Sequence, residues 1–239
     1  MKKIKIIAGQ CAVDEYYLET AKELKELGIE YLRSCIYKPR SKPDRWDGIK
    51  EYGLPMLKEA KHMGFKIVSE AMSIRQMLDL YNYIDIFQVG TRNMQSSELL
   101  KEFGEQSKPV MLKRAMCATI EEFVWASEFI TSQGNKNVML CERGIRTFET
   151  YTRNTFDINA IPAIKNLCDL EVIADPSHGT GRKELVSPVT LGAIAAGADG
   201  ILIEVHKYPE KSQTDAGQTL SIDEFKELLE KIKELEKIL

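Results

Sequence analysis

Short apolar runs alternate with longer amphipathic segments along the whole chain. The runs are rich in β-branched residues, as is typical of strands buried on both faces of a parallel sheet. The segments between them repeat apolar residues every three or four positions, which is typical of helices that pack on a sheet. The pattern predicts strands at residues 4–8, 31–36, 66–70, 84–89, 109–113, 138–141, 171–174 and 200–204.

Start and stop signals divide the amphipathic segments into helices. A glycine shortly before the next strand predicts a helix end, and such glycines are Gly28, Gly64, Gly134 and Gly197. Capping-box spacing predicts helix starts at Ser73, Thr119 and Ser221. Ser187 followed by Pro188 predicts another start, with proline at the first helical position.

Eight strand–helix units in 239 residues, without a linker or low-complexity break, predict a single (β/α)8 barrel over residues 1–239. No added regulatory domain is expected. Alternation alone also allows an open doubly wound sheet, but the strand count favours closure. The last helix, residues 225–239, is expected to dock on the barrel or on a neighbouring subunit.

Composition excludes some classes of function. The net charge is −3, with 44% hydrophobic and 29% charged residues, so no global field favours nucleic acid or an anionic membrane. No stretch approaches the roughly 18 apolar residues of a membrane span. Five cysteines, an odd number without close pairing or a signal peptide, predict a reducing cytoplasm.

Chemically active side chains follow the predicted strands, whose carboxyl ends meet at one face of a barrel. Four of them have ligand types that a divalent transition metal accepts: Cys11, His178, Glu204 and Asp215. The mixed set fits zinc, iron, cobalt or manganese better than calcium. Each residue also has an ordinary reading, such as a buried thiol for Cys11. His206 is expected to face away from Glu204, and His62 lies mid-helix.

A second set at the same face is cationic. It comprises Lys38, Arg40, Arg92, Lys113, Arg143 and Arg182. One guanidinium group can bind two oxygens of a phosphate or a carboxylate. Six cations therefore suggest two anionic groups, or one dianion and a carboxylate. Ion pairs with Glu70, Glu142 and Asp175 are the structural alternative.

Six motifs carry a resemblance to a known family, in order and over essentially the whole chain. They are "YKPRS", "GTRNMQ", "PVMLKRAM", "NVMLCERGIRTFETYTRNTFDI", "DPSHGTGR" and "EVHKYPEKSQTDAGQ". The chain resembles 3-deoxy-D-arabino-heptulosonate 7-phosphate (DAHP) synthases, and within them the short type related to 3-deoxy-D-manno-octulosonate 8-phosphate (KDO8P) synthase. That family has a (β/α)8 barrel.

The resemblance implies a transferase that condenses phosphoenolpyruvate (PEP) with erythrose 4-phosphate, the first step of the shikimate pathway toward chorismate and the aromatic amino acids. It implies a divalent metal ion, a homodimer or homotetramer, and the following site residues. Cys11, His178, Glu204 and Asp215 match metal ligands; Arg92, Lys113 and Arg143 match PEP-binding residues; Lys38 matches the lysine between the substrates; Arg40 and Ser41 match the aldose-phosphate site.

The chain departs from the family pattern at several positions. Gln10 stands where proline is usual, Thr91 where alanine is usual, and Ala115 where glycine is usual. The largest departure is residues 42–47, in the loop expected to meet the aldose phosphate. This change bears on the identity of the second substrate and hardly touches the expected PEP site.

Other functions remain as alternatives. KDO8P synthase would read Lys-Ala-Asn-Arg after the second strand, where this chain has Lys38-Pro39-Arg40-Ser41. A synthase of the sialic-acid type, or one with another aldehyde, fits less well. A Schiff-base aldolase using Lys113 would leave four metal-ligand types unexplained. A non-catalytic barrel that binds phosphometabolites is disfavoured because Cys11 and Lys38 are both present.

Overall fold

Eight parallel strands close into a barrel in the computed structural model, which describes residues 3–239. Each strand pairs with its neighbour in sequence, and β1 pairs with β8, with Gly9 opposite Glu204. Closure confirms the barrel and excludes the open doubly wound sheet. The strands are β1 (Lys5–Gln10), β2 (Tyr31–Ser34), β3 (Lys66–Glu70), β4 (Ile86–Val89), β5 (Val110–Lys113), β6 (Val138–Glu142), β7 (Glu171–Ala174) and β8 (Gly200–Glu204).

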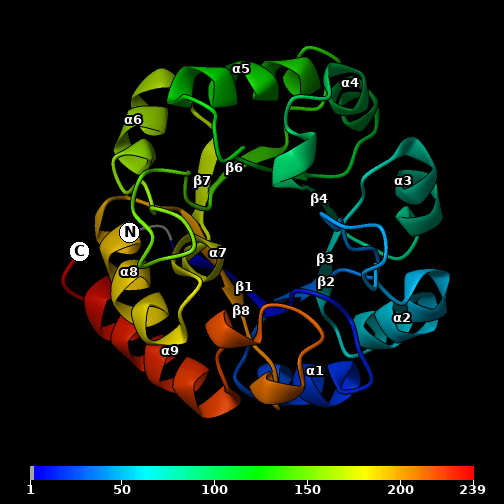
Figure 1. Cartoon of the computed structure of the whole chain (residues 1–239), viewed down its shortest axis with the longest axis vertical. Helices are drawn as coiled ribbons and strands as arrows, with labels where there is room; N and C mark the ends of the chain where they lie inside the picture. The colour runs from blue at the N-terminus through cyan, green and yellow to red at the C-terminus, as the bar shows by residue number, and fades with distance from the viewer. Residues whose placement is uncertain (1–2) are drawn as a thin grey trace.

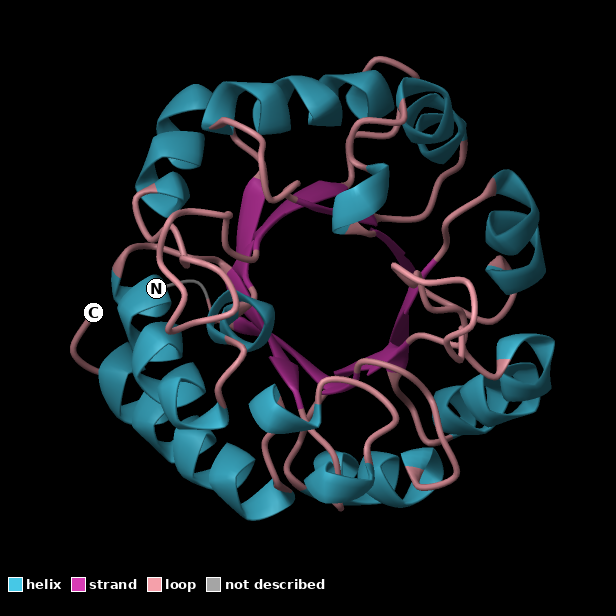
Figure 2. Cartoon of the chain, in the orientation of Figure 1, coloured by secondary structure: helices cyan, strands magenta, loops and turns pink. Residues whose placement is uncertain are grey.

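Helices form a ring around the strands (Figures 1 and 2). The α-helices are α1 (Tyr17–Glu26), α2 (Leu54–His62), α3 (Ile74–Leu80), α4 (Ser97–Glu105), α5 (Ile120–Thr131), α6 (Ala160–Leu167), α7 (Pro176–Thr180), α8 (Lys183–Ala195) and α9 (Ile222–Glu236). Short 3₁₀ turns are η1 (Lys50–Gly53), η2 (Thr91–Asn93), η3 (Pro209–Lys211) and η4 (Ala216–Gln218). In the described residues no helix is both long and apolar enough to cross a membrane.

Most of the predicted helix boundaries are confirmed. Ser73, Thr119 and Ser221 each accept a hydrogen bond from the backbone three residues later. All four predicted terminating glycines have positive φ, the conformation that glycine adopts without steric cost.

The prediction at Ser187 and Pro188 is wrong. Helix α8 begins at Lys183, directly after Gly181 ends α7 in the left-handed conformation, and Pro188 lies inside it. The carbonyl that loses its partner to this proline belongs to Glu184, an exposed residue in the first turn of the helix. The earlier start also lets the helix bury Val186.

The core has two parts, one between sheet and helices and one inside the barrel. The larger part includes Leu228, Leu229 and Ile232 of α9, so this helix docks on the barrel, as predicted. Ile238, beyond the end of α9, is 82% exposed. The smaller part is an apolar layer inside the barrel, with a buried residue from almost every strand: Ile7, Val68, Ile86, Met111, Met139, Cys141, Ile173 and Leu202, packed against Tyr31.

Two phenylalanines on α5 provide a matched test of this packing. Phe123 is fully buried, whereas Phe129 is 41% exposed. We expect Phe123→Ala to lower the free energy of unfolding by about 3–5 kcal/mol, because it removes buried area and leaves a cavity. Phe129→Ala, on the same helix, should cost less than about 1 kcal/mol. Urea unfolding followed by circular dichroism measures both, and equal losses would contradict the burial described.

Candidate active site and metal centre

A polar layer lies inside the barrel, directly above the apolar layer toward the carboxyl ends of the strands. Side chains alternate across a strand, so a residue two positions further on points to the same side. Two positions beyond the apolar layer the strands carry, in order, Gly9, Arg33, Glu70, Gln88, Lys113, Arg143, Asp175 and Glu204. None of the seven side chains is more than 4% exposed.

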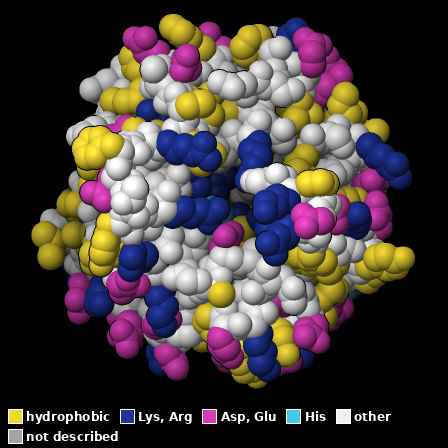
Figure 3. Space-filling model, in the orientation of Figure 1, with side chains coloured by type: hydrophobic (Ala, Val, Ile, Leu, Met, Phe, Trp, Pro, Cys, Tyr) yellow, Lys and Arg dark blue, Asp and Glu magenta, His cyan; other side chains and the backbone are white. Residues whose placement is uncertain are grey.

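The polar layer forms the floor of a cavity of about 110 Å³ at the mouth of the barrel. Figure 3 shows lysine and arginine side chains gathered around this hollow, although the whole chain is slightly acidic. The cavity is lined by Arg33, Lys38, Pro39, Arg40, Glu70, Gln88, Gly90, Thr91, Arg92, Lys113, Met116, Arg143, Arg153, His178 and Asp215. It is therefore a strongly cationic site that suits an anionic ligand.

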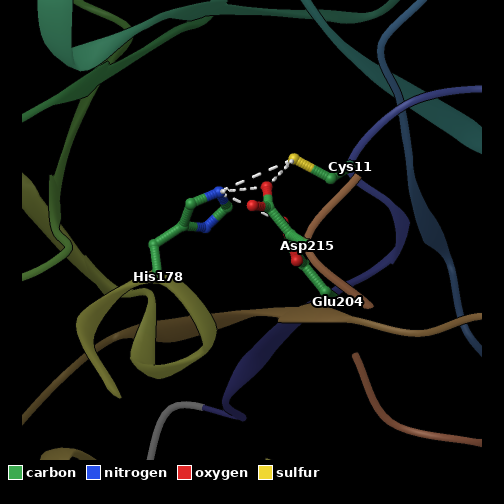
Figure 4. A group of neighbouring side chains, drawn as sticks. All are labelled: Cys11, His178, Glu204 and Asp215. Atoms are coloured by element: carbon green, nitrogen blue, oxygen red, sulfur yellow. Dashed lines mark hydrogen bonds and ion pairs between the residues drawn. The ribbon is translucent and has the colours of Figure 1, made fainter. Parts of the chain in front are cut away.

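Four side chains from the carboxyl ends of β1, β7 and β8 and the segments that follow them meet beside this cavity (Figure 4). Their ligand atoms, one each from Cys11, His178, Glu204 and Asp215, all lie within 4.8 Å of one another. His178 Nε2 is 3.1 Å from Glu204 Oε1 and 3.6 Å from Cys11 Sγ. Cys11 Sγ is 3.4 Å from Asp215 Oδ2. The structure thus brings together the four residues that the sequence predicts as metal ligands.

The geometry and chemistry of this cluster fit a divalent transition metal. Ligand bonds of 2.0–2.3 Å in a tetrahedral site place the ligand atoms roughly 3.3–3.8 Å apart, close to the distances here. Burial lowers the pKa of His178 to about 4, so its imidazole is neutral and available as a ligand. Burial opposes ionisation of Asp215, yet His178 and Arg153 bring its pKa below the ordinary value. Burial raises the pKa of the Cys11 thiol.

Each candidate ligand is oriented by a neighbouring side chain. His178 Nδ1 lies 2.7 Å from Asp175 Oδ2, a carboxylate–histidine arrangement common at metal sites. Arg33 donates to Glu204 Oε1 at 2.7 Å, and Gln218 donates to the other carboxylate oxygen at 2.8 Å.

Asp215 is held in the same way at the rim of the site. Arg153 Nη1 donates to Asp215 Oδ1 at 2.8 Å, which leaves Oδ2 facing the cluster. Asp215 has a positive φ of 59°, an uncommon conformation in which aspartate is enriched.

Lys38 links the metal cluster to the cationic cavity. It is 7% exposed, and its Nζ lies 2.7 Å from Cys11 Sγ. Its backbone N–H donates to the carbonyl of Asp47, and Lys50 donates to the carbonyl of Ile36. The chain after β2 therefore folds back on itself, and this fold places Lys38 at the mouth of the barrel.

The loop that departs most from the family pattern is held by backbone groups. Arg40 Nε donates to the carbonyl of Trp46 at 2.7 Å. Gly48, with φ of +106°, packs so tightly on the carbonyl of Ile36 that a Cβ would overlap it. Side chains at residues 42–47 do not take part in these two contacts, so the unusual sequence is compatible with them.

The predicted cations do not all reach the cavity. Lys113 and Arg143 are buried in the polar layer, Lys113 in an ion pair with Asp175. Arg40 and Arg92 lie at the exposed rim. Arg92 donates to Ser41 Oγ at 3.1 Å, which joins the predicted PEP residues to the predicted aldose-phosphate residues.

Arg182 lies elsewhere, which corrects the prediction that six cations converge. Its guanidinium stacks on the Tyr151 ring at 4.1 Å, donates to the Tyr151 carbonyl, and pairs with Glu184. These contacts hold it outside the set of residues that line the cavity.

Two buried arginines carry donor atoms without partners. Arg33 Nε and Arg143 Nε are both buried and unbonded. Burial lowers the pKa of Arg143. Buried donors without an acceptor are costly in free energy, so these two arginines are not explained by the pairing within the protein alone.

Gln10 takes part in a hydrogen-bond network behind Cys11. Its amide donates to Asp14 Oδ1 at 3.0 Å, and His206 Nε2 lies 2.8 Å from Asp14 Oδ2. His206 is fully buried and absent from the metal cluster, as predicted. The network joins the loop after β1 to the loop after β8, and these loops hold Cys11 and Asp215.

Another cavity, of about 560 Å³, lies at the opposite end of the barrel, where strands begin. Several charged groups around it are paired: Lys5 with Glu171, Lys61 with Asp85, and Lys66 with Glu30. Among the described residues, none of the buried polar atoms without a partner belongs to its lining. The mouth, with its unpartnered atoms, is the better candidate for a functional site.

Reasoning from sequence missed Arg33 and Arg153. Arg33 lies within an apolar strand segment, and an isolated charge at an inward position was the signal that could have revealed it. Arg153 belongs to the motif "ETYTRNT", but only the folded chain brings it to Asp215, 62 residues away.

Comparison with known proteins agrees with this site. The model of the DAHP synthetase I family matches residues 2–239. Phospho-2-dehydro-3-deoxyheptonate aldolase of Thermotoga maritima is 47% identical over 233 residues, which are 96% of this chain and 69% of that protein. 2-Dehydro-3-deoxyphosphooctonate aldolase of Desulfotalea psychrophila is 25% identical, over 95% of this chain and 88% of that protein.

Solved structures give the same result. The crystal structure of the Thermotoga maritima DAHP synthase superposes with a TM-score of 0.95 at 46% identity, covering 98% of this chain and 70% of that one. A truncated form of the Thermotoga maritima synthase superposes with a TM-score of 0.90 at 44% identity, covering 98% and 87%. The 2-dehydro-3-deoxyphosphooctonate aldolases are much more distant in sequence. The chain belongs to the DAHP synthetase I family.

Proposed function

We propose that this protein condenses PEP with erythrose 4-phosphate to give DAHP and phosphate, with a divalent metal ion bound at Cys11, His178, Glu204 and Asp215. The observation that carries the proposal is the placement of these four side chains beside a cationic cavity. Membership of the DAHP synthetase I family supports the same reaction.

Buried cations are proposed to hold PEP. Lys113 and Arg143 belong to the polar layer, and Arg92 lies above them at the rim. Arginine binds phosphate or carboxylate oxygens through two N–H groups, and the Arg143 Nε has no protein partner. Fixed in this way, PEP presents its reacting carbon to the aldehyde. Because the two reactants are already held together, less entropy is lost in reaching the reactive arrangement.

Lys38 and the rim are proposed to serve the second substrate. Arg40 and Ser41 are exposed at the mouth, where the phosphate of a four-carbon aldose would enter. Lys38 lies between these residues and Cys11. Its ammonium group can donate a proton to the oxygen that forms as the aldehyde is attacked.

The proposed metal ligands lie beside Lys38, whose Nζ is 2.7 Å from Cys11 Sγ. A divalent ion bound there would supply Lewis acidity toward the aldehyde oxygen. Asp175, Arg33, Gln218 and Arg153 keep the ligand atoms converged through the contacts described above. Zinc, iron, cobalt and manganese all suit this donor set.

We also propose that the protein works in the cytoplasm as a homodimer or homotetramer. All five cysteines are free thiols, as a reducing compartment would keep them. Ile74 and Leu78, one turn apart on α3, are both exposed, and such apolar surface suits an interface between subunits.

The reaction itself is tested by phosphate release from PEP in the presence of manganese. We expect turnover with erythrose 4-phosphate and little or none with arabinose 5-phosphate. Turnover restricted to the five-carbon sugar would show that residues 42–47 have changed the specificity. Absence of turnover with both sugars would refute the proposed function.

Two arginine variants separate the proposed substrate sites. Arg143→Ala should weaken PEP binding by about 2 kcal/mol or more, because it leaves a buried phosphate or carboxylate without its partner. Arg40→Ala should instead raise mainly the KM for the aldose phosphate. Initial rates with each substrate varied in turn measure both effects. Equal changes for both substrates in Arg143→Ala would contradict the assignment.

Two cysteine variants, one at the site and one away from it, test the metal centre. Cys11→Ala removes one of four ligands and should weaken divalent-metal binding at least about 100-fold, measured by calorimetric titration of metal-free protein. Cys117→Ala changes an exposed thiol and serves as the matched control. Metal affinity unchanged in Cys11→Ala, or full activity of the unmodified protein in excess chelator, would refute the metal role.

A further inference from the structure

Arg153 is a cation of the cavity whose ligand the proposed function does not name. The segment between β6 and α6 supplies it, beyond the carboxyl ends of the strands. Its side chain is 42% exposed, whereas Lys113 and Arg143 are almost fully buried. A ligand that enters the cavity from solvent can therefore reach the guanidinium group of Arg153.

Hydrogen bonding within the protein uses only one nitrogen of this guanidinium group. Nη1 carries two hydrogens, and it donates to Asp215 Oδ1 at 2.8 Å and to Gln218 Oε1 at 2.9 Å. Three of the five N–H groups of arginine remain, one on Nε and two on Nη2. Within residues 3–239, none of these three groups donates to a protein acceptor.

The remaining N–H groups form the edge of the guanidinium that suits an oxyanion. Nε–H and one Nη2–H are parallel, so together they can bind two oxygens of one phosphate or carboxylate. Because two acceptors hold Nη1, the plane of the group is fixed, and the free edge points away from Asp215.

Contacts along the chain also hold Arg153 in place. Its backbone N–H donates to the Thr180 carbonyl at 2.9 Å, and Asn154 Nδ2 donates to the His178 carbonyl at 2.9 Å. A Cβ at Gly181 would overlap the Arg153 Cβ, so the glycine lets the arginine lie against the end of α7. A side chain held in this way loses little further freedom when it binds an anion.

The other exposed arginines of the cavity do not offer the same edge. Arg40 donates its Nε–H to the Trp46 carbonyl, and Arg92 donates through Nη2 to Ser41 Oγ. Arg153 thus keeps a complete Nε–Nη2 edge at the open side of the cavity. The anionic groups of PEP already have the buried cations as proposed partners, which leaves the phosphate of the aldose.

We infer that Arg153 binds the phosphate group of the aldose through Nε–H and Nη2–H, a role that rests on the proposed function. Nη1 stays on Asp215, a proposed metal ligand. One guanidinium group would then join the two ends of the aldose site, with the phosphate at its free edge and the metal-ligand cluster at Nη1. An aldehyde without a phosphate would leave the free edge empty, so Arg153 is a specificity-determining residue for phosphorylated aldehydes.

Arg153→Lys tests this assignment, because an ammonium group keeps the positive charge beside Asp215 but lacks two parallel N–H groups. We expect the KM for erythrose 4-phosphate to rise at least about tenfold. The dissociation constants of PEP, and of manganese added to metal-free protein, should stay within about threefold of wild type. Both titrations also report that the variant is folded.

Erythritol 4-phosphate separates contact with the phosphate from an effect through Asp215. This molecule keeps the phosphate of the substrate but has no aldehyde oxygen for a metal ion to polarise. We expect it to compete with erythrose 4-phosphate, and we expect its inhibition constant to rise in Arg153→Lys by at least about tenfold, as the KM does. An unchanged inhibition constant, or no inhibition of the wild type, would contradict binding of the phosphate by Arg153.

Arg146→Lys is the matched control. Arg146 belongs to the same segment between β6 and α6, is exposed, and is not among the residues that line the cavity. Its KM values and manganese affinity should match those of wild type. A defect equal to that of Arg153→Lys would show that any change in this segment impairs the enzyme, and would refute a specific phosphate contact.

Three further outcomes would overturn the inference. One is an unchanged KM for erythrose 4-phosphate in Arg153→Lys. Another is a loss of manganese affinity as large as the rise in KM, which would restrict Arg153 to positioning Asp215. The third is a loss of PEP affinity of that size, which would place the free edge in the PEP site. Inactivity of the wild type would refute the proposed function together with this inference, whereas an active wild type with any of these three outcomes would refute this inference alone.

Discussion

Closure of the barrel imposes one constraint on which the site depends: alternate side chains of all eight strands must share a narrow interior. One layer of that interior is apolar, and the next layer toward the carboxyl ends is polar on every strand except at Gly9. Burying so many charged groups is costly. Pairing offsets part of the cost, since Arg33 binds Glu204 and Lys113 binds Asp175. The same pairs fix the metal-ligand cluster, because Glu204 belongs to it and Asp175 orients His178.

Pairing within the polar layer is incomplete. Arg33 Nε and Arg143 Nε lack acceptors, and Glu70 Oε1 and Gln88 Oε1 lack donors. Around these atoms, the cations at the mouth are held in fixed positions by the barrel. Preorganised groups of this kind cost no reorganisation when the reaction occurs.

The loop after β2 shows why a changed sequence can keep its place in the site. Asp47 and Trp46 bind Lys38 and Arg40 through backbone carbonyls, so these positioning contacts do not depend on the side chains at residues 46 and 47. Gly48 is constrained, because a Cβ there would overlap the backbone of Ile36. The network of Gln10, Asp14 and His206 similarly joins the loops that hold Cys11 and Asp215. Variation and function are thus compatible where the backbone makes the positioning contacts.

The sequence by itself determined the barrel, most helix ends and the four candidate metal ligands. Apolar runs, glycine stops and capping residues are local signals. Polar residues at the end of a strand can likewise be identified without knowing which other strands lie beside it. The start of α8 was mispredicted, because the helix begins at Lys183 and accommodates Pro188 in its interior. Tertiary structure alone decided that Arg182 stacks on Tyr151, that Arg153 reaches Asp215, and that Glu70 sits over Gly90. These contacts join residues distant along the chain, and only the packing of the closed barrel fixes which of them meet.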